Sequence, residues 1–287
     1  MEHLLLGKNV VSKIKEDIIE KIENLKENII FPKLTIMRIG NNPDDIVYQN
    51  NIARFCGTVG ITLDVLEFDS NVSNEEFINK FDEVNNDKFV DGILIFRPIP
   101  MHIDMEYIKN KIDHRKDIDG IGFSNMAALY AGDSNVIAPC TAEAVVALLD
   151  YYNIDLTGKL VTVLGRSLVV GKPVAMLLLN RNATVNICHS NTLNIAEICK
   201  KSDIIVSCVG NAKFVKENFV NDKSIVIDVG INIDEEGEVC GDVDFEKVEK
   251  IVKAITPVPR GVGGITNAIL AKHVVESANR RKNIYNI

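Results

Sequence analysis

Hydrophobic and polar positions along the first half of the chain follow two periods, one typical of helices and one typical of strands. Between residues 10 and 25, isoleucines recur at helical spacing among charged residues, which predicts an amphipathic surface helix. Three short apolar runs predict strands at residues 34–39, 61–66 and 92–96. Helices are predicted between them, at about 44–59 and from a Ser-Asn-Glu-Glu capping box at 73–76. This order predicts an α/β unit with a mainly parallel sheet.

The second half repeats the same order with more continuous apolar strands. Residues 159–165 (KLVTVLG) are typical of a strand buried on both faces of a parallel sheet. Further strands are predicted at 183–188, 203–209 and 224–229, and helices at 142–152, 173–180, 194–201 and 268–283. We therefore expect two α/β domains. Residues 1–141, completed by the C-terminal segment 268–287, form one domain, and residues 142–267 form a Rossmann-like, doubly wound parallel sheet.

Composition narrows the classes of partner. The 287 residues are 46% hydrophobic and carry a net charge of −8, which allows a sizeable core but offers no basic surface for a nucleic acid. No apolar run approaches the roughly 20 residues of a membrane span, and the N-terminus lacks the features of a signal peptide. We expect a soluble, cytoplasmic protein. The six cysteines and five histidines are dispersed, so neither disulfides nor a metal site are expected.

A glycine-bounded loop between a buried strand and a helix is the first candidate binding site. Free backbone N–H groups and the positive end of the helix favour a phosphate there. The candidate residues are Gly165, Arg166, Ser167 and Gly171. Their spacing departs from G-x-G-x-x-G, and a tight strand-to-helix turn is the alternative interpretation. A second strand follows at the distance expected of a mononucleotide-binding βαβ unit, which favours a dinucleotide.

The end of that second strand bears on the choice of cofactor. NAD enzymes usually place an acidic residue there for the ribose 2′-hydroxyl, whereas this chain has His189 and Ser190. With the Arg166 guanidinium nearby, this pattern favours NADP over NAD, although Arg166 could also be a solvated loop charge. Residues after the next two strands complete the candidate cofactor set: Gly210, Gly230 and Ile231.

Four segments carry a resemblance to a known family: residues 116–120 (KDIDG), 138–141 (APCT), 163–192 and 256–266 (TPVPRGVGGIT). In this order they closely resemble the methylenetetrahydrofolate dehydrogenase/methenyltetrahydrofolate cyclohydrolase family. The resemblance implies a homodimer whose two domains face each other across a cleft. It also implies NADP-linked oxidation of 5,10-methylenetetrahydrofolate to the methenyl form, followed by hydrolysis to 10-formyltetrahydrofolate.

The substrate-side residues match the family only in part. The resemblance implies that Tyr48 stacks on the aminobenzoyl ring of the folate and that Asp119 hydrogen-bonds the pterin. The family's lysine, which handles the proton and water chemistry of hydrolysis, is Ile52 here, and its glutamine partner is Phe96. Further substrate contacts are implied at three positions: Pro98, Gly261 and Thr266.

Loss of the lysine affects the two reactions differently. No lysine occurs between Lys33 and Lys80, so no small shift of register recovers one. Hydride transfer chiefly needs the reacting carbon held against the nicotinamide in a dry site, whereas activation of water needs a titrating group. We therefore predict a dehydrogenase with little or no cyclohydrolase activity, in which no catalytic residue of the hydrolytic step is retained.

Four further departures concern the surroundings of the expected site. Arg97, Arg260 and Gly264 replace a leucine, a glycine and a proline of the family, and Ala142 replaces a proline at a helix start. The two arginines could grip an anionic ligand such as a folate glutamate tail, or they could be rim residues in solvent. Two other functions stay open: an NADP-dependent oxidoreductase acting on a different folate or cyclic amine, and a non-catalytic dinucleotide-binding regulator. Retention of Tyr48 and Asp119 argues against the regulator.

Overall fold

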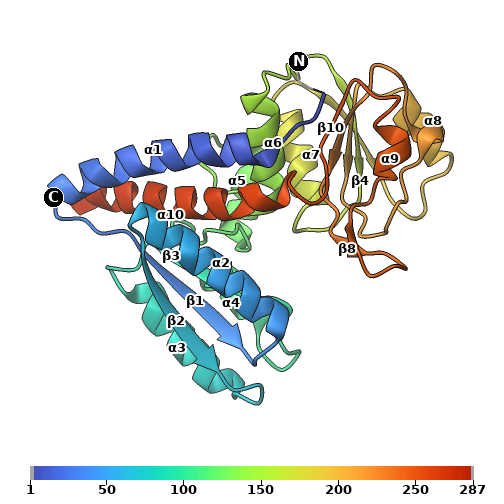
Figure 1. Cartoon of the computed structure of the whole chain (residues 1–287). Coiled ribbons are helices and arrows are strands. Elements are labelled where there is room, and N and C mark those ends of the chain that lie inside the picture. Colours follow the sequence, from blue (N-terminus) through green and yellow to red (C-terminus); the bar gives the residue numbers. More distant parts are fainter. Residues whose placement is uncertain (1–2, 286–287) are drawn as a thin grey trace. The chain divides into compact units, whose positions relative to one another are not determined.

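The computed structural model describes residues 3–285 and divides them into two compact units, each built from two separate parts of the chain (Figure 1). Residues 13–140 and 267–285 form the three-stranded unit, and residues 3–12 and 141–266 form the five-stranded unit. Residues 3–12, expected in the N-terminal domain, thus group with the later part of the chain. They group there because they pair with a segment of the five-stranded unit. The Leu5 N–H donates to Ile255 O at 2.9 Å, and Leu4 forms a β-bridge with Ile255.

The three-stranded unit holds a parallel sheet in the order β2-β1-β3. The strands are β1 (Lys33–Ile39), β2 (Thr62–Phe68) and β3 (Gly92–Ile95). The helices are α1 (Gly7–Glu27, whose first residues belong to the other unit), α2 (Pro43–Val59), α3 (Asn74–Asn86), α4 (Met105–Lys111), α5 (Phe123–Ala131) and most of α10 (Gly263–Tyr285).

Local signals explain where these helices begin and pack. The Asn42 side chain caps α2 by accepting the Asp44 N–H, and Ser73 caps α3 by accepting the Glu76 N–H. Phe77 and Phe81 of α3 are fully buried against the sheet. Helices α1 and α10 run side by side (Figure 1).

The five-stranded unit holds a parallel sheet in the order β10-β7-β6-β4-β5. Its strands are β4 (Leu160–Leu164), β5 (Thr184–Cys188), β6 (Ile204–Ser207), β7 (Ile225–Asp228) and β10 (Ala254–Ile255), with a separate antiparallel pair β8 (Asn232–Ile233) and β9 (Val239–Cys240). Its helical segments are α6 (Cys140–Tyr151, whose first residue belongs to the other unit), α7 (Gly171–Leu179), α8 (Ile195–Lys200), the 3₁₀ turn η1 (Glu217–Phe219) and α9 (Phe245–Val248).

The predicted α/β fold with parallel, doubly wound strands is confirmed. Strand β4 lies between β5 on one side and β6 on the other, so the strand order reverses direction beside β4. In open α/β sheets, ligands bind at such a reversal, beyond the carboxyl ends of the strands.

The structure also differs from the predicted elements at several places. The sequence analysis missed α4, α5, α9, β10 and the β8–β9 pair, which are short elements with little periodicity. Helix α7 begins at Gly171 rather than Pro173, and α10 begins at Gly263 rather than Ala268. Within residues 3–285, no helix is long and apolar enough to cross a membrane, and no three His, Cys, Asp or Glu side chains are grouped as metal ligands.

Candidate active site

The candidate cofactor residues of the five-stranded unit follow the carboxyl ends of its parallel strands. Leu164, the last residue of β4, pairs with the last residues of β5 and β6, and β6 ends level with β7. The register therefore brings the segments after these four strands to one edge of the sheet. These segments contain all the predicted cofactor residues: Gly165–Ser167 with Gly171, His189 and Ser190, Gly210, and Gly230 with Ile231.

Gly165 and Gly171 let the start of α7 approach the end of β4 closely. Gly165 has a φ of 120°, and a Cβ there would lie 2.6 Å from Cys208 O. A Cβ on Gly171 would lie 2.3 Å from Gly165 O. Ser167 Oγ accepts the Val170 N–H at 3.1 Å and orders the turn between them. A backbone cradle of this kind, at the positive end of a helix, favours the binding of a phosphate.

Two buried aspartates tie together the loops at this edge, and the sequence analysis missed them. Asp228, at the end of β7, accepts the N–H groups of Gly230, Asp242 and Val243 at 2.9–3.0 Å. Asp242 accepts the N–H groups of Val209 and Asn211 at 2.7 and 3.0 Å. Burial, followed by the nearby Asp242 charge, raises the pKa of Asp228 to about 7. The carboxylates thereby fix the backbone that carries Gly210 and Gly230.

The side chains at the same edge are less constrained. Arg166 and Ser190 are exposed, and so is the apolar side chain of Ile231, at 69%. The His189 ring is held from its own loop, because its Nδ1 accepts the Asn191 N–H at 3.2 Å. Because these side chains are exposed and the backbone beside them is ordered, a ligand can contact the side chains and the backbone N–H groups together.

In the three-stranded unit, α2 and the end of β3 position the predicted substrate residues. Tyr48 and Ile52 lie one turn apart on α2, and Phe96 directly follows β3. The Tyr48 and Phe96 rings are 5.4 Å apart between centroids. Ile52 is 1% exposed and Phe96 7%, so both side chains are buried and neither brings a polar group to this site. Burial raises the pKa of Tyr48 above the ordinary tyrosine value, which already lies well above neutrality, so its hydroxyl stays protonated.

Arg97 has a definite partner in this site. Its Nη2 lies 2.5 Å from Asp119 Oδ2, with side-chain exposures of 33% for Arg97 and 19% for Asp119. Asp119 Oδ1 accepts the N–H of Cys140, the first residue of α6, at 3.2 Å. The sequence analysis considered a ligand grip or a solvated rim for Arg97, and it missed this ion pair.

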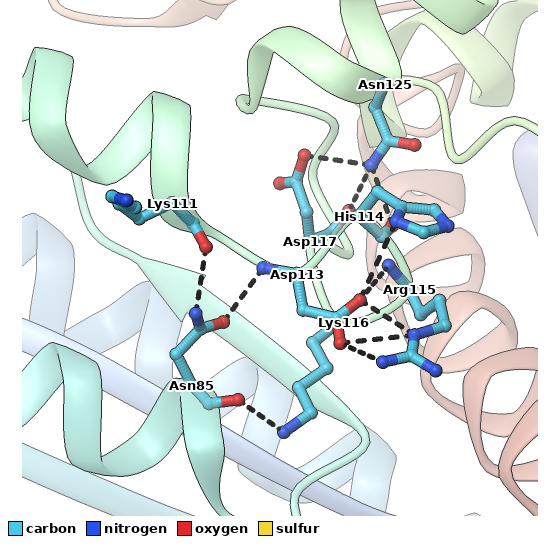
Figure 2. Close-up of polar contacts among 8 residues, drawn as sticks. All are labelled: Asn85, Lys111, Asp113, His114, Arg115, Lys116, Asp117 and Asn125. Carbon is cyan, nitrogen blue, oxygen red and sulfur yellow. Dashed lines mark hydrogen bonds and ion pairs between the residues drawn. The ribbon is translucent and has the colours of Figure 1, made fainter.

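The backbone that carries Asp119 is held by the network in Figure 2. The buried Asp117 carboxylate accepts a hydrogen bond from Asn125 Nδ2 at 2.9 Å (Figure 2). It also accepts the N–H groups of Ile121 and Gly122 at 2.9 and 2.8 Å. Lys116 Nζ donates to two backbone carbonyls, including Asn85 O at 2.7 Å. The ammonium closest in sequence to Asp119 is therefore engaged in holding the loop.

The remaining predicted substrate residues are divided between the units. Pro98 is exposed and follows Arg97 in the three-stranded unit. Gly261 is buried in the five-stranded unit, where a Cβ would lie 2.5 Å from Pro257 O, and Thr266 lies in the first turn of α10 in the same unit. Arg260, also in the five-stranded unit, has a φ of 87°, in the left-handed region that favours glycine.

Comparisons with known proteins match this chain along nearly its whole length. The family model for the catalytic domain of tetrahydrofolate dehydrogenase/cyclohydrolase matches residues 5–119, and the model for its NAD(P)-binding domain matches residues 139–282. The bifunctional protein FolD of Clostridium botulinum is 48% identical over 98% of this chain and 99% of its own.

Solved structures agree with these matches. The bifunctional methylenetetrahydrofolate dehydrogenase/cyclohydrolase FolD of Campylobacter jejuni is 38% identical, with a TM-score of 0.94 over 97% of this chain and 99% of its own. The Trypanosoma brucei enzyme, solved with NADP and an inhibitor, is 32% identical, with a TM-score of 0.90 over 96% of this chain and 97% of its own.

Proposed function

Because the chain belongs to the tetrahydrofolate dehydrogenase/cyclohydrolase family, we propose that it oxidises 5,10-methylenetetrahydrofolate to 5,10-methenyltetrahydrofolate with NADP and hydrolyses the product little or not at all. One observation carries the second half of this proposal. The two positions that correspond to the family's lysine and glutamine are a buried isoleucine and a buried phenylalanine, Ile52 and Phe96.

The cofactor half of the proposal rests on the carboxyl edge of the five-stranded sheet. The close approach of Gly171 to Gly165 leaves backbone N–H groups and the start of α7 for a pyrophosphate. Arg166 would face the 2′-phosphate of NADP, since no acidic residue stands at the end of β5 to hold a free 2′-hydroxyl. When bound, NADP accepts the hydride from the one-carbon bridge of the folate.

For hydride transfer, the chain's residues position the folate and exclude water. Tyr48 offers a ring face, Asp119 offers carboxylate lone pairs, and Ile52 and Phe96 supply an apolar wall. The folate itself stabilises the developing cation through the nitrogens on either side of the reacting carbon, so this step needs no protein base.

Hydrolysis makes a different demand, because a group must accept a proton from the attacking water. Ile52 and Phe96 cannot do so. Tyr48 holds its proton at neutral pH as an ordinary tyrosine does, and burial raises its pKa further. Arginine is no substitute for a base, because its pKa lies above about 12. Lys116 is bound to backbone carbonyls.

The test is to assay the two reactions separately with purified protein. Formation of the methenyl product from methylenetetrahydrofolate is measured by its absorbance after acid has destroyed the reduced nucleotide, with NADP and NAD compared. Hydrolysis is followed as the loss of added methenyltetrahydrofolate, with a bifunctional relative assayed in parallel. We expect oxidation with NADP and hydrolysis close to the uncatalysed rate. Hydrolysis at a rate comparable to the relative's would overturn the proposal.

We further propose that the protein is a homodimer, as the family resemblance implies. Light scattering coupled to size-exclusion chromatography measures its mass in solution against 31.8 kDa for one chain. A single-chain mass at assay concentration would contradict a dimer.

A further inference from the structure

The Arg97–Asp119 ion pair presents a hydrogen-bond donor and an acceptor side by side. The pair uses one of the five N–H donors of Arg97, and the side chain makes no other hydrogen bond to residues 3–285. Asp119 binds Arg97 through Oδ2 and the Cys140 N–H through Oδ1, which leaves lone pairs on both oxygens. Both side chains are partly exposed, at 33% and 19%, so a ligand can reach them.

The pair is fixed in place before any ligand arrives. Asp119 lies in the loop ordered by Asp117 and Lys116, and its carboxylate is held at the first turn of α6. Arg97 follows the buried Phe96 at the end of β3. A preorganised donor and acceptor cost little ordering entropy on binding, so they can discriminate strongly between ligands.

An aromatic ring lies beside the pair. Tyr48 packs against Phe96, the residue that precedes Arg97, with 5.4 Å between the ring centroids. A ligand that contacts both the Tyr48 ring and the Arg97–Asp119 pair therefore has a flat ring system with a polar edge. Its edge must offer N–H groups to the carboxylate and an acceptor to the guanidinium.

The pterin ring of a folate has such an edge, with an amino group at C2, an N–H at N3 and a carbonyl oxygen at C4. We propose that Arg97 is a specificity-determining residue that donates to the C4 carbonyl oxygen while Asp119 accepts from N3–H and the C2 amino group. This inference rests on the proposed function, because it takes a reduced folate as the substrate. It assigns Arg97 a role that the leucine of the family cannot perform.

A matched pair of ligands tests this assignment. Folic acid carries the C4 carbonyl, whereas aminopterin carries an amino group in its place, which would point a donor at the Arg97 guanidinium. Aminopterin also lacks the hydrogen on N3, a difference toward Asp119 that is the same in the wild type and in Arg97→Leu. Calorimetry gives the dissociation constants of both ligands for the wild type and for Arg97→Leu. We expect the preference for folic acid over aminopterin to fall about tenfold in the variant, because one charge-assisted hydrogen bond is lost from the carbonyl ligand only.

Two further variants separate recognition from folding. Arg97→Lys keeps a positive charge and should retain part of the preference. Arg181→Leu, which breaks the ion pair of Arg181 with Asp150 in the five-stranded unit, should leave the preference unchanged. A change of fold would weaken both ligands together, whereas loss of recognition changes their ratio.

The outcomes distinguish this inference from the proposed function. A fall in preference of about threefold or more in Arg97→Leu, with no change in Arg181→Leu, supports it. If the preference in Arg97→Leu falls by less than threefold and the wild type oxidises methylenetetrahydrofolate, the role of Arg97 is overturned and the proposed function stays in place. A wild type that neither oxidises this substrate nor binds folic acid overturns both.

Discussion

In the five-stranded unit the candidate residues are arranged by backbone contacts, whereas in the three-stranded unit they depend on the identity of a few side chains. The parallel strands end at one edge of the sheet, and the segments that follow them pack closely there. This close packing leaves no room for a Cβ at three positions: Gly165, Gly171 and Gly230. The Tyr48 site instead depends on which side chains occupy positions 52 and 96. Chemistry that depends on side chains can be lost without a change of fold, while a backbone site cannot change without one.

The similarity to solved structures is in keeping with this difference. A TM-score of 0.94 to a bifunctional enzyme shows that the backbone is shared, whereas the loss of hydrolysis that we propose rests on the side chains at positions 52 and 96 alone. Restoring side chains should therefore restore chemistry, and disturbing the backbone of the other unit should weaken cofactor binding.

The largest expected effect comes from restoring both polar side chains. In the double variant Ile52→Lys/Phe96→Gln we expect hydrolysis of methenyltetrahydrofolate to rise about 10²–10⁴-fold, the usual contribution of a positioned acid or base. The measurement is the rate of loss of methenyl absorbance in variant and wild type.

The matched control for the double variant is Ile52→Met/Phe96→Met, which changes both positions without adding a titrating group. It should show no gain in hydrolysis. A folded Ile52→Lys/Phe96→Gln protein that still oxidises methylenetetrahydrofolate but hydrolyses nothing would show that the difference between the units is not confined to these side chains.

A single methyl group should damage the backbone site. Gly171→Ala places a Cβ 2.3 Å from Gly165 O, a backbone atom that cannot move alone, so we expect a loss of about 2–3 kcal/mol in the free energy of unfolding. NADP binding should weaken at the same time. Urea denaturation and calorimetry with NADP measure the two effects.

Gly57→Ala in α2 is the control, because no atom lies within 4 Å of its added Cβ. The free energy of unfolding should rise there by up to about 1 kcal/mol, since alanine is the better helix former. If Gly171→Ala behaved like Gly57→Ala, the close contact between α7 and β4 would not determine the cofactor site.

Arg166 is the side chain at the cofactor edge on which we expect the choice of cofactor to depend. In Arg166→Gln the KM for NADP should rise about tenfold, equivalent to about 1.4 kcal/mol, while the KM for NAD changes little. Initial rates with each nucleotide give both constants, and Arg181→Gln is the control in the same unit. Equal changes for both nucleotides would place Arg166 away from the 2′-phosphate.

A pH dependence of stability is expected to arise from Asp228. Its pKa is raised to about 7 in the fold, chiefly by burial, whereas an unfolded aspartate titrates near 3.9. Between these values the folded state binds a proton that the unfolded state lacks. The contribution of this proton to the stability of the folded state is therefore complete below about pH 4 and is lost as the pH rises through 7. The free energy of unfolding changes by at most about 1.4 kcal/mol per pH unit in this range.

Urea denaturation of the wild type and of Asp228→Asn between pH 5 and 8 checks this slope. The wild type should lose stability relative to the variant as the pH rises. The exposed residue Asp155 provides the control, because Asp155→Asn should parallel the wild type over this range. A wild-type curve parallel to that of Asp228→Asn would mean that Asp228 does not titrate there.

Much of the fold could be predicted from the sequence, because long apolar runs and capping residues are local signals. The continuous run at 159–165 and the Ser73 cap each predict an element that the structure contains. Strands β8, β9 and β10 have two residues each and carry no period to detect. Strand β10 forms by pairing with the distant strand β7, which a local pattern does not record, and β8 and β9 pair only with each other across a short turn.

The candidate site divides in the same way. Gly165 and Gly171 were found because a glycine-rich turn after a buried strand is a local pattern. The Arg97–Asp119 pair joins residues 22 positions apart, and the Asp228–Asp242 contacts join residues 14 apart across the β8–β9 pair. Nothing in the spacing of these residues indicates that they meet, so they required the structure.

The division of each unit into two stretches of chain has a consequence for biosynthesis. When a ribosome has made the first 140 residues, neither unit has all of its parts, since one still needs residues 267–285 and the other needs 141–266. The nascent chain must therefore keep apolar surface of α1 and of the three-stranded sheet uncovered until translation is nearly finished. Folding that is completed so late gives chaperones a long period in which to engage the emerging polypeptide.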